Sequence, residues 1–267
     1  MPKTEQLLHR IDELQKETGV RRTIFAACPN SPAVISASIR AAKRNNAPIY
    51  FAATLNQIDC DGGYTGMTQA EFTRLIRFEV ERVHFTGPVI VAIDHGGPWL
   101  KDRQRTEKWS VKDAMDGVKK SFEAAVLAGY DLIHVDPTVD INVPKGEIID
   151  IRLVAARTVE LIAHVENFRK QKGLPAISYE VGTEEVTAAS RTRRRSIRSS
   201  MNSNKGWLML VCPMYGPVSS SGRWAQTWTP RCSTLRSRRR SPQRYALWVA
   251  TSKVTTPTMW LTRRSIL

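Results

Sequence analysis

Short apolar runs alternate five times with helix-patterned segments between residues 4 and 186, and this alternation limits the possible fold more than any other feature. The runs are rich in Ile, Val and Ala, which is typical of strands buried on both faces of a parallel sheet. The expected strands are 23–28, 48–54, 89–93, 132–136 and 176–181. The expected helices are 4–17, 33–42, one beginning after Thr68, one containing 114–126, and 149–170. Alternation of this kind requires right-handed crossovers and a mainly parallel sheet.

Polar residues stand at the end of every expected strand. They are Asn30, Asn56-Gln57, Asp94-His95, Asp136 and Glu180. In a (β/α)8 barrel these ends meet at one rim, where catalytic residues gather. We therefore predict an α/β fold of the (β/α)8 TIM-barrel type, incomplete because about five units cannot close an eight-stranded barrel. A doubly wound sheet is the second choice, since no Gly-rich phosphate loop follows the first strand.

The helix after Thr68 has the clearest start signal in the chain. In Thr68-Gln69-Ala70-Glu71 the hydroxyl can accept a hydrogen bond from the N–H of Glu71. The Glu71 carboxylate can in turn accept one from the N–H of Thr68. This capping box predicts a helix that begins directly after Thr68 and buries Phe72 and Ile76.

The last 81 residues, 187–267, differ in composition from the rest of the chain. They contain no Asp or Glu but 14 Arg and 2 Lys, a formal charge of +16. Residues 1–186 hold 24 basic and 25 acidic residues, so the net charge of +15 arises in the tail. We therefore predict two regions, a partial barrel domain over 1–186 and a basic Arg/Ser/Trp-rich tail over 187–267.

Three interpretations of this tail are open. A reading frame slid back by one base lets residues 187–192 encode His-Gly-Gly-Leu-Ala-Asp and residues 224–229 encode Val-Gly-Thr-Asp-Leu-Asp, which suggests a frameshift near codon 187. The second interpretation is a disordered extension. The third is a nucleic-acid-binding tail, in which Arg binds phosphates and Trp stacks on bases. The basic and aromatic residues follow no motif spacing, which disfavours nucleic acid as a partner.

The pair Asp94-His95 is the sharpest candidate for chemistry. An imidazole at the carboxyl end of a strand can bind a divalent metal. An adjacent carboxylate can move a proton or orient a ligand. The alternative is that Asp94 caps the following turn and His95 satisfies backbone groups.

His134, Asp136 and Glu180 are further candidates on the expected fourth and fifth strands. His134 and Asp136 are two residues apart, so their side chains point to the same face of the strand. If that face is the barrel interior, both join the site; if not, His134 is a hydrogen-bonded core histidine. Glu180 lies in an apolar run and needs a cation or metal as its partner.

The loop after the second strand can hold a sugar or a phosphate. Asn56 and Gln57 offer side-chain amides, and the glycine-rich segment 62–66, which includes Gly63, offers backbone N–H groups. The alternative is a structured loop whose glycines serve its turns.

The sequence also limits the cellular compartment in which the protein is expected. No apolar run approaches the roughly 20 residues that span a bilayer, and residues 1–17 lack the apolar stretch of a signal peptide. We expect a cytoplasmic protein without a membrane partner. The four cysteines lack metal-finger spacing and are expected to be free thiols.

Four separated motifs in this order resemble one family. They are Asn56-Gln57 with Gly62-Gly63-Tyr64-Thr65-Gly66-Met67-Thr68, then Asp94-His95-Gly96-Gly97-Pro98, then Ile133-His134-Val135-Asp136, then Ser178-Tyr179-Glu180-Val181-Gly182-Thr183-Glu184. Over roughly residues 20–186 the chain resembles the non-catalytic, Z-type subunit of class II tagatose-bisphosphate aldolase.

The resemblance implies a role for each candidate residue. Asp94 and Glu180 look like catalytic carboxylates, and His95 and His134 look like ligands of zinc or another divalent metal. Asn56, Gln57, Gly63 and Asp136 are expected to bind substrate.

The resemblance also implies a function. The family supports a catalytic aldolase subunit that cleaves tagatose 1,6-bisphosphate, a phosphorylated ketose, to glyceraldehyde 3-phosphate and dihydroxyacetone phosphate in galactitol breakdown. A metal-dependent ketose epimerase or aldolase acting alone is the alternative, because retro-aldol cleavage and epimerisation both use a metal-polarised ketone and a base. A basic-tailed nucleic-acid-binding protein is the third possibility.

Overall fold

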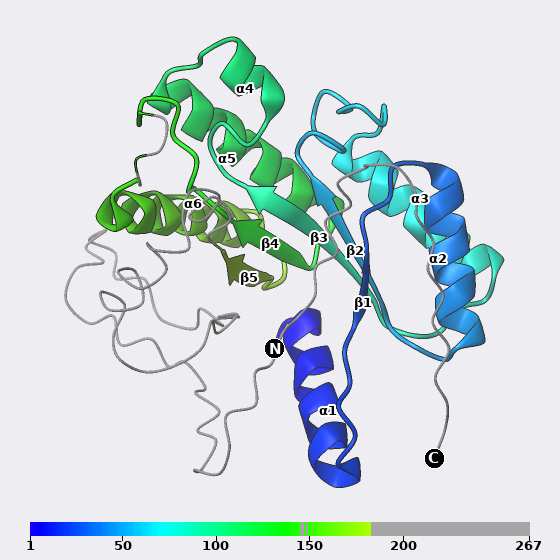
Figure 1. Cartoon of the computed structure of the whole chain (residues 1–267). Coiled ribbons are helices and arrows are strands. Elements are labelled where there is room, and N and C mark those ends of the chain that lie inside the picture. Colours follow the sequence, from blue (N-terminus) through cyan, green and yellow to red (C-terminus); the bar gives the residue numbers. More distant parts are fainter. Residues whose placement is uncertain (145–146, 148, 183–267) are drawn as a thin grey trace, which may run out of the picture.

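A computed structural model of the chain describes residues 1–144, 147 and 149–182 (Figure 1). The predicted tail, 187–267, lies outside the described residues, so the structure tests none of the three interpretations of it. The described helices are α1 Lys3–Thr18, α2 Pro32–Arg44, α3 Gln69–Arg82, α4 Asp102–Thr106, α5 Val111–Ala128 and α6 Ile151–Gln171. The described strands are β1 Phe25–Ala27, β2 Ile49–Thr54, β3 Val89–Gly96, β4 Leu132–Val135 and β5 Ser178–Val181.

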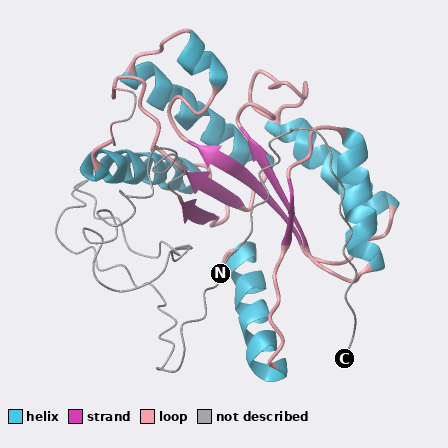
Figure 2. Cartoon of the chain, viewed as in Figure 1, coloured by secondary structure: helices cyan, strands magenta, loops and turns pink. Residues whose placement is uncertain are grey.

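The five strands form one parallel sheet in the order β1-β2-β3-β4-β5 (Figure 2). Each strand pairs with the strand before it in the chain, for example Phe51 with Val91 and Ile133 with Tyr179. This consecutive order is the order of a (β/α)8 barrel, whereas a doubly wound sheet reverses direction at a switch point. The predicted α/β fold is therefore confirmed, with five strands of barrel order in the described part of the chain.

The two faces of the sheet have different contents. One face packs against α2, α3, α5 and α6 in a single apolar core. Phe51, Ile93 and Ile133 lie on this face and are almost fully buried. Because side chains alternate along a strand, the opposite face carries Tyr50, Asp94, His134 and Glu180. The sheet thus separates an apolar outer side, covered by helices, from an inner side that carries these polar residues together with Ile90, Ala92 and Leu132.

Local signals fix where the helices begin and end. The capping box predicted at Thr68 is confirmed, since Thr68 Oγ1 accepts from the N–H of Glu71 and the N–H of Thr68 donates to the Glu71 carboxylate. Ser110 caps α5 in the same way by accepting from the N–H of Asp113, and α5 ends at Gly129 in the left-handed conformation. The one-turn helix α4 was not predicted, because its five polar residues carry no apolar period.

Helix α1 lies at the amino ends of the strands, below the sheet in Figure 1. Lys3 Nζ forms an ion pair of 3.2 Å with Asp131, directly before β4, and α1 also contacts β5. The first helix therefore closes the end of the sheet opposite to the polar rim. Among the described helices, none is long and apolar enough to cross a bilayer.

Candidate active site

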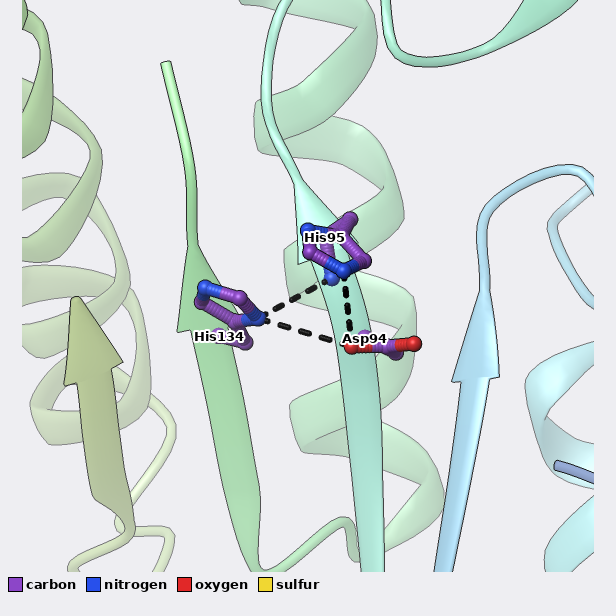
Figure 3. Close-up of side chains that lie close together, drawn as sticks. All are labelled: Asp94, His95 and His134. Carbon is purple, nitrogen blue, oxygen red and sulfur yellow. Dashed lines mark hydrogen bonds and ion pairs between the residues drawn. The ribbon is translucent and has the colours of Figure 1, made fainter. Parts of the chain in front are cut away.

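Asp94, His95 and His134 come together at the carboxyl ends of β3 and β4, and we call them the Asp94 cluster (Figure 3). One ligand atom from each residue lies within 4.8 Å of the other two. Asp94 Oδ1 is 3.5 Å from His95 Nε2 and 3.5 Å from His134 Nδ1. Three side chains that sequence analysis proposed for catalysis and metal binding thus share one site.

A bulge in β3 brings Asp94 and His95 to the same place. Consecutive residues of a regular strand point to opposite faces. Here Ile93 pairs with Ile133 and Gly96 with Val135, so two residues of β3 oppose His134 of β4. His95 has a φ of +49°, a left-handed value that a non-glycine residue rarely adopts. The irregular backbone aims both side chains at one cluster, as bulges near active sites often do.

Asp136 fixes the orientation of His95. Its Oδ2 is 3.1 Å from His95 Nδ1, and its Oδ1 accepts from the backbone N–H of Thr138. Burial raises the pKa of the Asp136 carboxyl, but the hydrogen bonds from His95 and Thr138 outweigh burial and hold the pKa below its usual range. An ionised Asp136 keeps the Nδ1 proton on His95 and leaves Nε2 facing Asp94. This contact was not expected, because Asp136 was predicted to bind substrate.

His134 has one ring nitrogen inside the cluster and one outside it. Nδ1 accepts from the backbone N–H of His95 at 3.3 Å and faces Asp94. Nε2 is buried and has no hydrogen-bond partner among the described residues. It packs against Gly182, where a Cβ atom would lie only 2.1 Å from Nε2. The glycine after β5 is therefore required for the position of this imidazole.

Glu180 and Tyr50 extend the polar face beside the cluster. Glu180 pairs in register with His134 across β4 and β5. Burial raises the pKa of Glu180 above its usual value; His134 and His95 oppose this rise, and Asp94 adds to it. Burial also raises the pKa of Tyr50 well above 10, and the negative charges of Glu180 and Asp94 add to the rise. Tyr50 was missed in the sequence because an aromatic residue in an apolar strand is typical of a core position.

Asn56, Gln57 and Gly63 lie in the loop after β2, where their polar groups hold the loop itself. Asn56 donates to the carbonyl of Leu100 at 3.2 Å and accepts from the N–H of Asp102 at 2.8 Å. The Gln57 amide accepts from the N–H of Thr54 and donates to the carbonyl of Pro29. Gly63 has a φ of +52°, and a Cβ there would lie 2.4 Å from the carbonyl oxygen of Gln57. Their role in substrate binding stays a prediction.

The donor set of the Asp94 cluster fits a divalent metal. Two imidazoles and one carboxylate are the ligands that catalytic zinc sites use, with a fourth position left for water or substrate. The Asp136–His95 pair is the carboxylate–histidine contact that commonly supports such ligands. Nε2 of His134 faces Gly182 and lies outside this donor set, so Nδ1 is the His134 atom that would bind the metal. His95, His134 and Asp94 are the residues that would hold the metal.

Comparison with protein families identifies the family of the chain. The profile of the family described as "D-tagatose-1,6-bisphosphate aldolase subunit GatZ/KbaZ-like" matches residues 8–193. The chain belongs to this family. The match contains the Asp94 cluster, Asp136 and Glu180, and it ends eight residues after Glu185, the last acidic residue of the chain. The predicted family is confirmed.

A solved structure of related fold agrees with the arrangement of strands and helices. It is the crystal structure of a probable tagatose 6 phosphate kinase from Sinorhizobium meliloti 1021, with a TM-score of 0.51 and 29% sequence identity. The alignment covers 66% of this chain and 43% of that protein. The aligned part of this GatZ/KbaZ-like chain thus spans less than half the length of that relative.

Proposed function

We propose that this GatZ/KbaZ-like chain is an accessory subunit of a D-tagatose-1,6-bisphosphate aldolase, acting in the cytoplasm in galactitol breakdown. The observation that carries the proposal is the family match over residues 8–193, since the family is described as a subunit of this aldolase. A catalytic partner subunit would carry out retro-aldol cleavage to glyceraldehyde 3-phosphate and dihydroxyacetone phosphate.

A second function, turnover by this chain alone as a metal-dependent ketose epimerase or aldolase, is favoured by the Asp94 cluster. A bound divalent metal would polarise the carbonyl of a ketose. Asp136 would hold His95 in the tautomer that presents Nε2, and the bulge at His95 keeps both ligands in place. Glu180, whose raised pKa moves it toward neutrality, could accept and return a proton on the same face.

Phosphoryl transfer, which the name of the Sinorhizobium protein as a kinase suggests for that protein, has less support in this chain. Strand β1 is followed by Cys28-Pro29-Asn30-Ser31-Pro32, which contains no glycine. A glycine-rich loop whose N–H groups cradle phosphates is the usual requirement after such a strand.

The experiment compares this chain over residues 1–267, the catalytic aldolase subunit, and both together in an assay of tagatose 1,6-bisphosphate cleavage. An accessory role predicts no turnover by this chain, but a several-fold longer half-life of the partner's activity when both are present. Zinc-dependent turnover by this chain alone, lost in His95→Ala, would establish the second function instead. His9→Ala is the matched control, because His9 is an exposed histidine on α1.

We also propose that residues 187–267 derive from a shifted reading frame. The acid-free composition and the end of the family match at residue 193 support this proposal. Sequencing the gene across codons 180–270 from independent template tests it. A single-base slip near codon 187 that restores acidic residues is the expected result, and confirmation of the printed frame would overturn it.

A further inference from the structure

Tyr50 is a polar residue on the inner face of the sheet that the metal site does not use. Because side chains alternate along β2, Phe51 packs in the apolar core on the outer side and Tyr50 points to the inner side. The inner side also carries Asp94 and Glu180. The phenol therefore shares a face with the proposed site although it belongs neither to the metal ligands nor to the outer core.

The inner face has room for the phenol to extend toward the carboxyl ends of the strands. The next inner positions after Tyr50 and its neighbour on β3 are Ala52 and Ala92, which pair in register. Two residues of a strand span about 6.6 Å, a length that a phenol side chain can cover. The hydroxyl can thus reach the level of Ala92, one inner position before Asp94, without meeting a large side chain from β2 or β3.

The charges that act on the phenol agree with this direction. Burial raises the pKa of Tyr50 well above 10, and the negative charges of Glu180 and Asp94 raise it further. Both carboxylates stand near the carboxyl ends of their strands, β5 and β3. Electrostatic effects weaken with distance, so the phenol lies toward these carboxylates and not toward the amino ends of the strands.

Tyr50 and Glu180 both have hydrogen-bonding capacity that a ligand can reach. Among the described residues, neither the Tyr50 hydroxyl nor the Glu180 carboxylate has a hydrogen-bond or ion-pair partner. Neither group is among the unpartnered side-chain atoms that are closed to solvent. A largely buried tyrosine hydroxyl usually has a hydrogen-bond partner, so an accessible hydroxyl without one indicates a place for a ligand.

We propose that Tyr50 binds substrate beside the Asp94 cluster: its phenol donates a hydrogen bond to a carbonyl or hydroxyl oxygen of a ketose, and the Glu180 carboxyl group accepts from a neighbouring hydroxyl. This role rests on the proposed function, which makes a phosphorylated ketose the ligand. A phenol that keeps its proton near neutral pH can donate and adds no further negative charge beside the carboxylates. A sugar offers the adjacent donors and acceptors that such a pair requires.

The test is calorimetric titration of the chain over residues 1–267, supplied with zinc, with tagatose 1,6-bisphosphate. Tyr50→Phe removes only the hydroxyl and should weaken the affinity about tenfold, because one hydrogen bond to the ligand is lost. Tyr130→Phe is the matched control, since Tyr130 is buried in the apolar core on the outer side, and it should leave the affinity unchanged. The near-ultraviolet difference spectrum of ligand binding should lose its tyrosine contribution in Tyr50→Phe but not in Tyr130→Phe.

Urea denaturation of the ligand-free variants separates a binding role from a structural one. The Tyr50 hydroxyl has no partner in the described part of the chain, so Tyr50→Phe should not lower the free energy of unfolding. A lower free energy of unfolding together with an unchanged affinity would assign the hydroxyl to the fold and overturn the proposal.

Equal affinity in the wild type and Tyr50→Phe would also overturn the proposal, and so would absence of tagatose 1,6-bisphosphate binding by the wild-type chain. Neither result decides the accessory role, which the half-life of the partner's activity measures separately. Conversely, binding that depends on Tyr50, without turnover and without an effect on the partner, would support the role of Tyr50 and reject the proposed function.

Discussion

Two polar clusters at the carboxyl ends of the strands differ in how completely their groups are paired. In the first, which we call the Asp59 network, Lys101 Nζ lies 2.6 Å from Asp59 Oδ2 and 2.8 Å from Asp61 Oδ1. The other oxygen of Asp59 accepts from Gln69 at 2.9 Å. In the Asp94 cluster the contacts are 3.3 to 3.5 Å, and Nε2 of His134, on the side of the ring away from Asp94, has no hydrogen-bond partner in the described part of the chain.

The difference separates polar residues that stabilise the fold from polar residues that retain capacity for a ligand. The Asp59 network links the loop after β2 to the loop after β3 and to α3. Its short contacts occupy both carboxylate oxygens of Asp59 and the ammonium group of Lys101. Polar networks that are fully satisfied rigidify a structure, whereas partly satisfied ones are costly unless something else completes them. Mutation of the Asp59 network should therefore mainly lower the free energy of unfolding, and mutation next to the Asp94 cluster should mainly lower metal affinity.

The largest expected effect is on stability, in the Asp59 network. Asp59→Ala leaves the largely buried Lys101 and Gln69 without their main acceptor and should lower the free energy of unfolding by about 3 kcal/mol. Urea denaturation measures the change. Asp61→Ala is the control, because the Asp61 carboxylate is 44% exposed and its loss should cost less than about 1 kcal/mol. Equal losses in the two variants would contradict the distinction between the clusters.

The next effect concerns metal rather than stability. In the metal-binding arrangement proposed above, Asp136→Asn should weaken zinc binding by about 10- to 100-fold, because the carboxylate that orients His95 is removed. Competition with a chromophoric chelator measures the affinity. Asp116→Asn, an exposed carboxylate on α5, should leave it unchanged. An unchanged affinity in Asp136→Asn would mean that His95 does not bind zinc through the arrangement described above.

A smaller effect is expected where the Asp94 cluster meets β5. Gly182→Ala places a Cβ atom against His134 Nε2 and should cost about 2 kcal/mol of stability through overpacking. In the His134→Ala background the same substitution should cost much less, since the clashing ring is gone. A double-mutant cycle measured by urea denaturation gives the coupling between the two positions. Additive effects would show that the two residues do not meet.

The smallest effect is a pH dependence of the metal-free protein. Folding raises the pKa of Glu180, so its ionisation opposes folding, and this penalty grows as pH rises from the unfolded value of 4.5 through the folded pKa. Glu180→Gln should therefore raise the free energy of unfolding at pH 7 by about 1 kcal/mol, with the gain vanishing below pH 4.5. Denaturation series at several pH values test this.

The pH dependence of stability expected from Asp136 has the opposite sign to that expected from Glu180. Its pKa is lowered in the folded protein, so its contribution to stability is present above the unfolded value of 3.8 and is lost as pH falls through the folded pKa. Asp136→Asn should thus reduce the change of the free energy of unfolding with pH below pH 3.8. Glu180→Gln should reduce that change above pH 4.5. The same slope in both variants would contradict the assigned pKa directions.

The sequence was sufficient for the strands, the order of the elements and the pair Asp94-His95, but it left open whether His134 lies beside them or in the core. Apolar runs such as 89–93 have one strong interpretation, and the polar residues that follow them must meet at the carboxyl edge of a parallel sheet. The bulge was beyond sequence reasoning, because the positive φ of His95 arises from pairing with β4, about 40 residues later in the chain.

Hydrogen-bond partners distant in sequence explain what was not predicted. Asn56 resembles a ligand-binding amide until its partners are known to be Leu100 and Asp102, which lie before and at the start of α4, more than 40 residues away. Arg157 resembles an ordinary helix residue, because nothing near it in sequence indicates that its guanidinium is buried over Trp99. Such partner choices follow from tertiary packing rather than from local pattern.

The consecutive strand order has a consequence for synthesis of the chain on the ribosome. Each strand pairs with the one made just before it, so the sheet can grow by one strand–helix unit at a time as the polypeptide emerges. Helix α1 is the exception, because the partner of Lys3 is Asp131, 128 residues later. Helix α1 is therefore made well before the residues against which it packs, Asp131 and those of β5, and can dock only after they have been synthesised.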